Sequence, residues 1–187
     1  MKQSWKPGTV LYPLPAVLVS CGAAPEEYNM LTVAWTGTVC SDPPMCFISV
    51  RPERHSHAII SRTGEFVINL TTRRLARAAD WCGVRSGRDF DKFREMGLTA
   101  VPSEKVAAPL IAESPVNIEC RVRQVLPLGT HDMFLAEVVD IDPATGRFCL
   151  ERADPIVYSH GEYFALGEAL GHFGWSVRKK KKAPKRR

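Results

Sequence analysis

Short apolar runs separated by turn-forming residues dominate the hydrophobic pattern of the chain. Residues 30–39 and 45–50 are rich in β-branched and aromatic side chains, and a Ser-Asp-Pro-Pro segment at 41–44 separates them. Runs of this length and composition predict one β-strand each. Because proline cannot donate a hydrogen bond to a sheet, Pro43 and Pro44 are expected between strands or at a sheet edge.

Similar runs recur along the chain, with few helical patterns between them. Strands are predicted at 16–21, 66–70, 117–127, 133–141, 148–150 and 155–158, and short helices at 55–62, 73–82 and 89–96. Apolar and polar residues alternate in 117–127, which predicts a strand with one face in solvent, paired antiparallel with 133–141. This order favours a mainly β domain with short helices, predominantly antiparallel and closed as a barrel, over a doubly wound sheet.

The composition is that of one globular domain. A chain of 187 residues with 45% hydrophobic residues fits a single domain with its own core. No apolar run approaches the roughly 20 residues of a membrane span. The first ten residues, MKQSWKPGTV, lack the apolar core of a signal peptide. We therefore expect a cytoplasmic protein without a membrane span.

The net charge of +5 is unevenly distributed. Residues 178–187 hold eight of the 25 Lys and Arg residues and no acid, which leaves 17 basic against 20 acidic residues in the rest of the chain. Self-repulsion predicts a disordered basic tail at 178–187 behind a folded domain at 1–177. A solubilising tail is favoured over a dedicated nucleic-acid module because no aromatic residue lies among the charges. Weak, salt-dependent binding of this tail to nucleic acid or an anionic surface is the alternative.

The six cysteines do not form a metal-binding or redox motif. No pair has the CxxC spacing, and most lie inside apolar runs, which predicts buried, reduced thiols. Clustered zinc ligands are absent from the sequence, so no metal site is expected. His160 and His172 have no ligand-spaced companions and are interpreted as structural.

The run 30–39 mixes hydroxyl-bearing and small residues in an unusual way for a strand. Thr32 and Thr36 carry hydroxyls, while Ala34 and Gly37 are small among bulkier neighbours. Gly37 indicates a bulge or a close approach by another group. Together with Trp35, these residues would suit a flat, polar-edged ligand. The pattern alone favours an ordinary half-buried strand with β-prone threonines.

The start of the helix predicted at 55–62 is a candidate anion site. A helix N-terminus offers backbone N–H groups and the positive end of the helix dipole, which together suit a phosphate. Ser56 can add a hydroxyl, and Arg51 or Arg54 a charge-assisted hydrogen bond. The alternative is that Ser56 caps the helix and the arginines are solvated. Downstream, Lys92 and the loop that carries Arg85 and Arg88 could reach a phosphate or remain surface charge.

Several segments resemble one protein family in order and spacing. Asn29-x-x-Thr32-x-Ala34-x-Thr36-x-x-Val39-x-x-Asp42-Pro43-Pro44 is similar to the signature strand pair of the flavin reductase-like family. The resemblance covers roughly 8–177 and continues through Ser49-Val50-Arg51-Pro52, Arg54-His55-Ser56-His57, Glu65 to Leu70, Asp91-Lys92-Phe93, His131 and Gly171 to Ser176. Ala34 and Cys40 stand where many relatives carry Ser, which removes two hydroxyls.

The resemblance implies a split β-barrel that binds FMN, with FAD less expected, at the interface of a homodimer. Residues 32–37 and 49–51 would flank the isoalloxazine and ribityl chain, and Ser56, His57 and nearby arginines would meet the phosphate. His131, before a return strand, is a candidate catalytic residue or a turn cap. The implied cofactor-binding residues are Asn29, Thr32, Ala34, Trp35, Thr36, Gly37, Ser49, Val50, Arg51, Ser56, His57 and Lys92.

The activity implied by the resemblance is that of an NAD(P)H-dependent flavin reductase, which passes electrons from reduced flavin to an acceptor or partner protein. No acid–base triad is needed for such a reaction. Absence of a dinucleotide fingerprint does not exclude NAD(P)H, since a nicotinamide can stack on an exposed flavin. A flavoredoxin-like FMN electron carrier without NAD(P)H oxidation of its own is the main alternative, and binding of nucleic acid or an anionic surface through the tail is the second.

Overall fold

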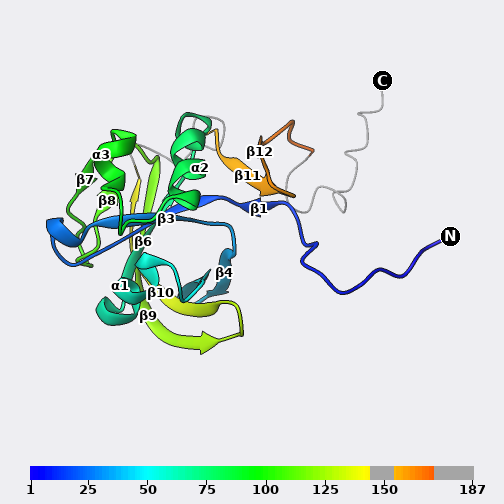
Figure 1. Cartoon of the computed structure of the whole chain (residues 1–187), viewed down its shortest axis with the longest axis horizontal. Helices are drawn as coiled ribbons and strands as arrows, with labels where there is room; N and C mark the ends of the chain where they lie inside the picture. The colour runs from blue at the N-terminus through cyan, green and yellow to red at the C-terminus, as the bar shows by residue number, and fades with distance from the viewer. Residues whose placement is uncertain (144–153, 171–187) are drawn as a thin grey trace, which may run out of the picture.

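The computed structural model describes residues 1–143 and 154–170, and a seven-stranded antiparallel sheet forms its body (Figure 1). The strand order is β3-β2-β6-β9-β10-β5-β4. The bounds are β2 (Val17–Cys21), β3 (Asn29–Val33), β4 (Thr36–Ser41), β5 (Pro44–Val50), β6 (Glu65–Leu70), β9 (Val116–Pro127) and β10 (Asp132–Pro143). The strands predicted at 16–21, 45–50, 66–70, 117–127 and 133–141 are therefore confirmed.

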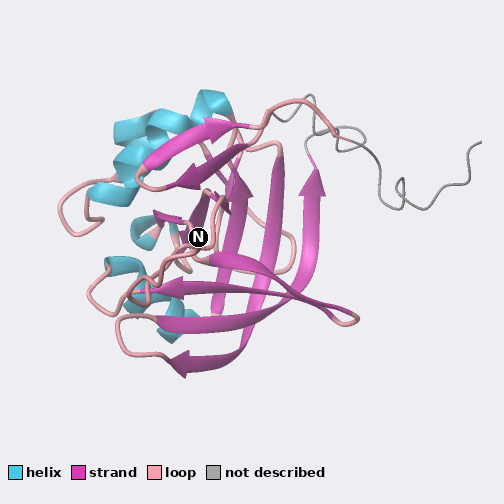
Figure 2. Cartoon of the chain, turned by 90° about the vertical axis from the view of Figure 1, so that its right-hand side faces the viewer, coloured by secondary structure: helices cyan, strands magenta, loops and turns pink. Residues whose placement is uncertain are grey.

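The prediction of a single strand at 30–39 is wrong. The run divides into β3 and β4, which lie at opposite edges of the sheet and are joined by Ala34 and Trp35 alone. Seven flat strands would set these edges about 29 Å apart, whereas the three Cα steps from Val33 to Thr36 span at most about 11 Å. The sheet must therefore curl until its edges come close, as Figure 2 shows. The Ser49 N–H donates to the Trp35 carbonyl oxygen (2.8 Å) and ties this connection to β5.

The turn between β4 and β5 follows the proline prediction. Asp42 and Pro43 form the turn, and Pro44 is the first residue of β5, so neither proline interrupts a central strand. Gly37 lies under the ring of Phe47, where an added Cβ would be 3.2 Å from a ring carbon. Of the two alternatives predicted for Gly37, a bulge or a close approach by another group, the structure shows the close approach. The register shift itself falls later, between Thr38 and Cys40.

Three α-helices lie among the strands. α1 (His55–Thr63) ends at Gly64, which adopts the left-handed conformation (φ 69°) and donates its N–H to the Ile60 carbonyl. The helix predicted at 73–82 begins as a 3₁₀ turn, η2 (Arg73–Leu75), and continues as α2 (Ala76–Val84), without a side-chain cap from Thr72. The helix predicted at 89–96 is shorter, α3 (Lys92–Met96), because Asp91 accepts the Arg94 N–H and caps it there.

Smaller elements complete the described part. A short 3₁₀ turn, η1 (Pro25–Glu27), precedes β3. β1 (Leu14–Pro15), β11 (Ile156–Ser159) and β12 (Glu162–Ala165) form a three-stranded sheet, and β7 (Ala100–Val101) pairs with β8 (Leu110–Ile111). The strand predicted at 155–158 is thus confirmed as β11. The strand predicted at 148–150, the segment Gly171 to Ser176 and the basic tail lie outside the described residues.

The concave side of the curled sheet holds the main core. Val19, Ile48, Phe66, Cys120 and Phe134 are fully buried there. A second cluster lies between the sheet and the helices α2 and α3, and contains Leu18, Met30, Cys82, Phe93 and Ile111. Burial of these side chains, which come from every strand of the sheet except β4, stabilises the closed barrel.

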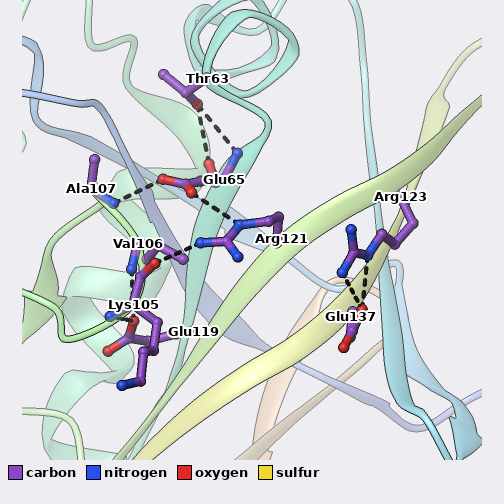
Figure 3. A network of polar contacts seen from close by, with 9 residues as sticks. All are labelled: Thr63, Glu65, Lys105, Val106, Ala107, Glu119, Arg121, Arg123 and Glu137. Carbon is purple, nitrogen blue, oxygen red and sulfur yellow. Dashed lines mark hydrogen bonds and ion pairs between the residues drawn. The ribbon is translucent and has the colours of Figure 1, made fainter.

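The prediction that one face of 117–127 lies in solvent is wrong at the beginning of the strand. Glu119 is fully buried, and its carboxylate accepts the backbone N–H groups of Glu104 (2.8 Å), Lys105 (2.7 Å) and Val106 (3.0 Å) (Figure 3). Arg121 donates to the Lys105 carbonyl (2.8 Å) and binds the carboxylate of Glu65. The loop at 104–106 thus covers this part of the polar face. Its three backbone N–H groups compensate for the loss of hydration of the buried carboxylate.

The cysteines of the described part are free thiols. Cys21, Cys46, Cys82 and Cys120 are buried and Cys40 is half-buried, as predicted; Cys149 lies outside the described residues. Burial raises the pKa of the Cys21 thiol to about 12, so it stays protonated near neutral pH. Across residues 1–143 and 154–170, no helix is long and apolar enough to cross a membrane, and no three His, Cys, Asp or Glu side chains gather as a metal ion would require.

Candidate functional site

A first cavity of about 380 Å³ opens where the two edges of the curled sheet meet. The β3–β4 connection, the end of β5, the helix α2 and the β11–β12 hairpin surround it. Its lining residues are Ala16, Leu31, Thr32, Val33, Ala34, Trp35, Ser49, Val50, Arg51, Arg54, Asp80, Gly83, Val84, His131, Tyr158, Gly161 and Tyr163.

Trp35 and His131 form a stacked pair in the wall of this cavity. Their ring centroids are 5.9 Å apart with an interplanar angle of 8°, and Trp35 remains 36% exposed. Burial, together with the charges of Arg51 and Arg54, lowers the pKa of His131. Its imidazole is therefore mainly neutral at pH 7 and supplies no fixed positive charge to the cavity.

The Thr32 hydroxyl is already engaged within the protein. It donates to the Ala79 carbonyl of α2, and a Cβ at Gly83 would be 3.3 Å from the Thr32 Cβ. Gly83 thus allows α2 to approach β3 closely at this point. Thr32 shapes the cavity through its position, with its hydroxyl hydrogen directed to the helix.

A second cavity of about 420 Å³ adjoins the first and shares Leu31, Arg51, Arg54 and Val84 with it. It lies at the N-terminus of α1, where Ser56 is 1% exposed. The Asn29 side-chain amide donates to Ser56 Oγ (2.7 Å), so the hydroxyl hydrogen of Ser56 is directed elsewhere. Ser56 does not cap α1, since no side-chain cap bond is formed at this end.

Positive charge dominates the second cavity. It is lined by Arg51, Arg54, Arg85, Arg88 and Lys92, with Glu53 as the acid. Lys92 is only 3% exposed, and its Nζ donates to the Cys82 carbonyl (2.8 Å). Burial lowers the pKa of Lys92 to about 8. Such a concentration of guanidinium and ammonium groups at a helix N-terminus is typical of sites that bind anions.

The structure brings ten of the thirteen predicted site residues to these two cavities and leaves three away from them. Thr36 is buried and donates to the Phe47 carbonyl (2.6 Å). Gly37 lies under the Phe47 ring. His57 Nε2 is 2.8 Å from Asp132 Oδ2.

Several lining residues were not singled out from the sequence. Tyr158, Gly161 and Tyr163 come from the β11–β12 hairpin, more than one hundred residues after Trp35, and no local pattern marks them. Asp80 and Val84 are exposed residues of α2. Arg85 and Arg88, left open as surface charge, both line the second cavity.

A protein-family model described as a flavin reductase-like domain matches residues 9–167. The chain belongs to the flavin reductase-like family. The structure of flavoredoxin of Desulfovibrio vulgaris (Miyazaki F) is 32% identical and superposes with a TM-score of 0.87, over 95% of this chain and 100% of that one. The predicted split-barrel fold is thereby confirmed for this flavin reductase-like protein.

Two curated relatives are also similar to this chain. An uncharacterised protein of Pyrococcus abyssi is 34% identical over 130 residues, which are 70% of this chain and 74% of the relative. A Streptomyces viridifaciens protein named NADPH-flavin oxidoreductase is 28% identical over 127 residues, 65% of this chain and 63% of the relative.

Proposed function

We propose that this flavin reductase-like protein binds FMN along the joined first and second cavities and acts as an NAD(P)H-dependent flavin oxidoreductase. The observation that carries the proposal is the polarity of the groove. Its first cavity is lined by several aromatic and small residues, and its second cavity is cationic. FMN has the same polarity, with a flat ring system at one end and a phosphate dianion at the other.

The residues of the second cavity fit the phosphate in kind and direction. Because Ser56 Oγ accepts a hydrogen bond from Asn29, the Ser56 O–H can donate to a phosphate oxygen. The first backbone N–H groups of α1 are available as donors at the same place. Arg51 lines both cavities and would contact the phosphate from the side of the ribityl chain.

The residues of the first cavity fit the ring system. Ala34 allows the ring to approach the chain that crosses between the sheet edges, and Trp35 with His131 limits its movement on one side. Tyr158 and Tyr163, packed edge to face at 5.8 Å, belong to the hairpin on this cavity. When bound, FMN supplies the redox chemistry, accepting a hydride from NAD(P)H and passing electrons to an acceptor. The neutral His131 side chain positions the ring and offers a hydrogen bond to it.

The first experiment is the absorption spectrum of the purified chain before and after FMN addition and gel filtration. We expect flavin bands that co-elute at about one equivalent per chain, followed by bleaching when NADH or NADPH is added without oxygen. Protein that retains neither FMN nor FAD would contradict the proposal.

The phosphate contact is tested by a matched pair of serine variants on α1. Ser56→Ala should weaken FMN binding by about 1–3 kcal/mol, because a hydrogen bond to a charged phosphate is lost. Arg51→Ala should have an effect of the same size. Ser61→Ala, an exposed position on the same helix, should leave FMN affinity unchanged. Equal affinities in all three variants would place the phosphate elsewhere.

A second function is favoured by one comparison. The flavoredoxin structure covers this chain almost completely at 32% identity, which supports an FMN electron carrier that does not oxidise NAD(P)H itself. Rapid anaerobic mixing separates the two, since a carrier retains oxidised flavin with NAD(P)H and is bleached only by a reduced protein donor. We also propose a homodimer, which sedimentation equilibrium of the FMN-loaded chain tests directly.

A further inference from the structure

A third cavity, of about 690 Å³, adjoins the second on the side away from the first. It shares Gly87 and Arg88 with the second cavity, and its walls come from η1, the loop before α3, and the region of β7. We propose that this third cavity holds the adenosine of an adenine dinucleotide whose diphosphate lies in the second cavity. The inference rests on the proposed flavin function and names a further part of the ligand that the site accepts.

The charge of the second cavity exceeds what FMN requires. Its lining side chains include four arginines and one lysine, against the single acid Glu53. A phosphate monoester carries a charge of at most about −2 near neutral pH. Arg88 borders both the second and the third cavity, so it can contact a second phosphate group that follows the first toward the third cavity. The surplus of cations therefore fits a diphosphate, or two phosphates side by side.

The third cavity has the opposite character and suits a neutral nucleoside. Tyr28, Phe90 and Phe93 supply aromatic surface, and Phe90 is 37% exposed. The Phe90 ring packs edge to face with Trp81, with centroids 5.4 Å apart, and the Arg85 guanidinium lies 5.7 Å from its centroid, so the ring is held in place beside the cavity. Stacking on such a ring is how proteins hold a purine base.

Acidic residues in the third cavity decide which part of a dinucleotide enters it. Glu26, Asp89 and Asp91 outnumber Arg88 there. Carboxylates repel phosphate but accept hydrogen bonds from ribose hydroxyls. The phosphates are therefore held in the second cavity while the ribose and adenine extend into the third.

Gly87 lies between the second and the third cavity and packs closely against Asn29. An added Cβ at this position would lie 2.2 Å from Asn29 Oδ1. The loop backbone can lie this close to Asn29 only because Gly87 has no side chain. Gly87 and Arg88 of the loop before α3 thus separate the second cavity from the third.

The adenosine has two sources in flavin chemistry, FAD and NAD(P)H. The experiment measures, by calorimetry on the full chain, the affinity for ADP, FMN and FAD, and for ADP after loading with FMN. We expect ADP to bind the flavin-free chain. ADP binding that persists in the FMN-loaded chain assigns the third cavity to the nicotinamide dinucleotide. ADP binding that FMN abolishes, together with FAD affinity above that for FMN, assigns it to FAD.

Phe90→Ala is the variant that locates the adenosine. It should lower ADP affinity about 5- to 100-fold through loss of stacking and leave FMN affinity unchanged. Phe164→Ala, at an exposed phenylalanine of β12 outside the three cavities, should change neither affinity. The inference is overturned by wild-type protein that binds FMN but not ADP, by loss of ADP binding to FMN without any advantage of FAD, or by a Phe90→Ala variant with unchanged ADP affinity. Failure of the proposed function is a separate result, since wild-type protein would then not bind FMN.

Discussion

Burial of the charged Lys92 side chain destabilises the flavin-free fold. Lys92 is 3% exposed, and burial lowers its pKa from 10.5 to about 8. In the unfolded chain the group stays protonated up to pH 10.5, so keeping it charged in the fold costs about 3 kcal/mol at pH 7. This penalty is fully present below pH 8 and disappears as the pH rises to 10.5. Lys92→Met removes it, and also removes the hydrogen bond to the Cys82 carbonyl, worth about 1 kcal/mol.

The flavin-free Lys92→Met variant should therefore be more stable than the wild type by about 2 kcal/mol at pH 7. Urea unfolding at pH 7 and at pH 10 measures the difference, which should shrink to zero or change sign at the higher pH. Lys105→Met, at an exposed lysine, is the control and should show no such pH dependence. A variant that is less stable than the wild type by the same amount at both pH values would refute the reasoning.

The same substitution should weaken FMN binding, because a bound phosphate would stabilise the charged ammonium group. Loss of one charge-assisted contact corresponds to about 1.5–3 kcal/mol. In the wild type, FMN affinity should fall as the pH rises through about 8, since the flavin-free Lys92 loses its proton there. Fluorescence titration of FMN between pH 6 and pH 9.5 checks both statements. Equal affinities of the wild type and Lys92→Met over this range would show that Lys92 does not contact the phosphate.

Three further substitutions test the packing of the described part. Gly87→Ala should displace the Asn29 side chain from Ser56 and weaken FMN binding by about 1–2 kcal/mol, whereas Gly167→Ala meets no atom within 4 Å and serves as control in the same titration. Glu119→Ala should destabilise the fold by about 3 kcal/mol in urea unfolding, because three backbone N–H groups lose a charged acceptor, and Glu119→Gln should cost less. Burial, with the neighbouring carboxylate of Glu119, raises the pKa of Asp142 to about 6. Ionisation of this carboxyl group therefore destabilises the folded state progressively as the pH rises from about 4 through 6. Asp142→Asn should thus raise the thermal midpoint at pH 7 and lose this advantage near pH 4, and an advantage that persists at pH 4 would contradict the assignment.

The strands could be predicted because their signals are local. Runs of β-branched residues bounded by Pro, Gly and Asn determine where a strand begins and ends, and these limits were found within a few residues. The break at Ala34 and Trp35 has no such signal, since both residues continue the apolar run. It follows from closure of the curled sheet, which only pairing of distant strands determines. Glu119 is hidden for the same reason, because the loop that covers it is not predictable from the alternation along its own strand.

The site residues that lie away from the cavities show the limit of reading a motif as a continuous segment. Trp35, in the connection between the sheet edges, lines the first cavity, whereas Thr36 begins β4 and its hydroxyl donates to the Phe47 carbonyl of β5. Along a helix the next residue is turned by about 100°, so Ser56 faces the second cavity while His57 reaches Asp132 instead. The resemblance located the segments, and the local geometry decided which side chains of each segment reach the groove.

His57 nevertheless has a part in how the groove is built. Its bond to Asp132 joins the helix that carries Ser56 to the strand that follows His131. The two ends of the groove, cationic at α1 and aromatic at His131, are thereby connected through this hydrogen bond between His57 and Asp132 rather than through the ligand alone. A ligand that spans both cavities meets elements whose relative position the protein has already restricted, so less conformational freedom is lost on binding. The same restriction explains why a residue of the family motif can matter for the site without touching what the site holds.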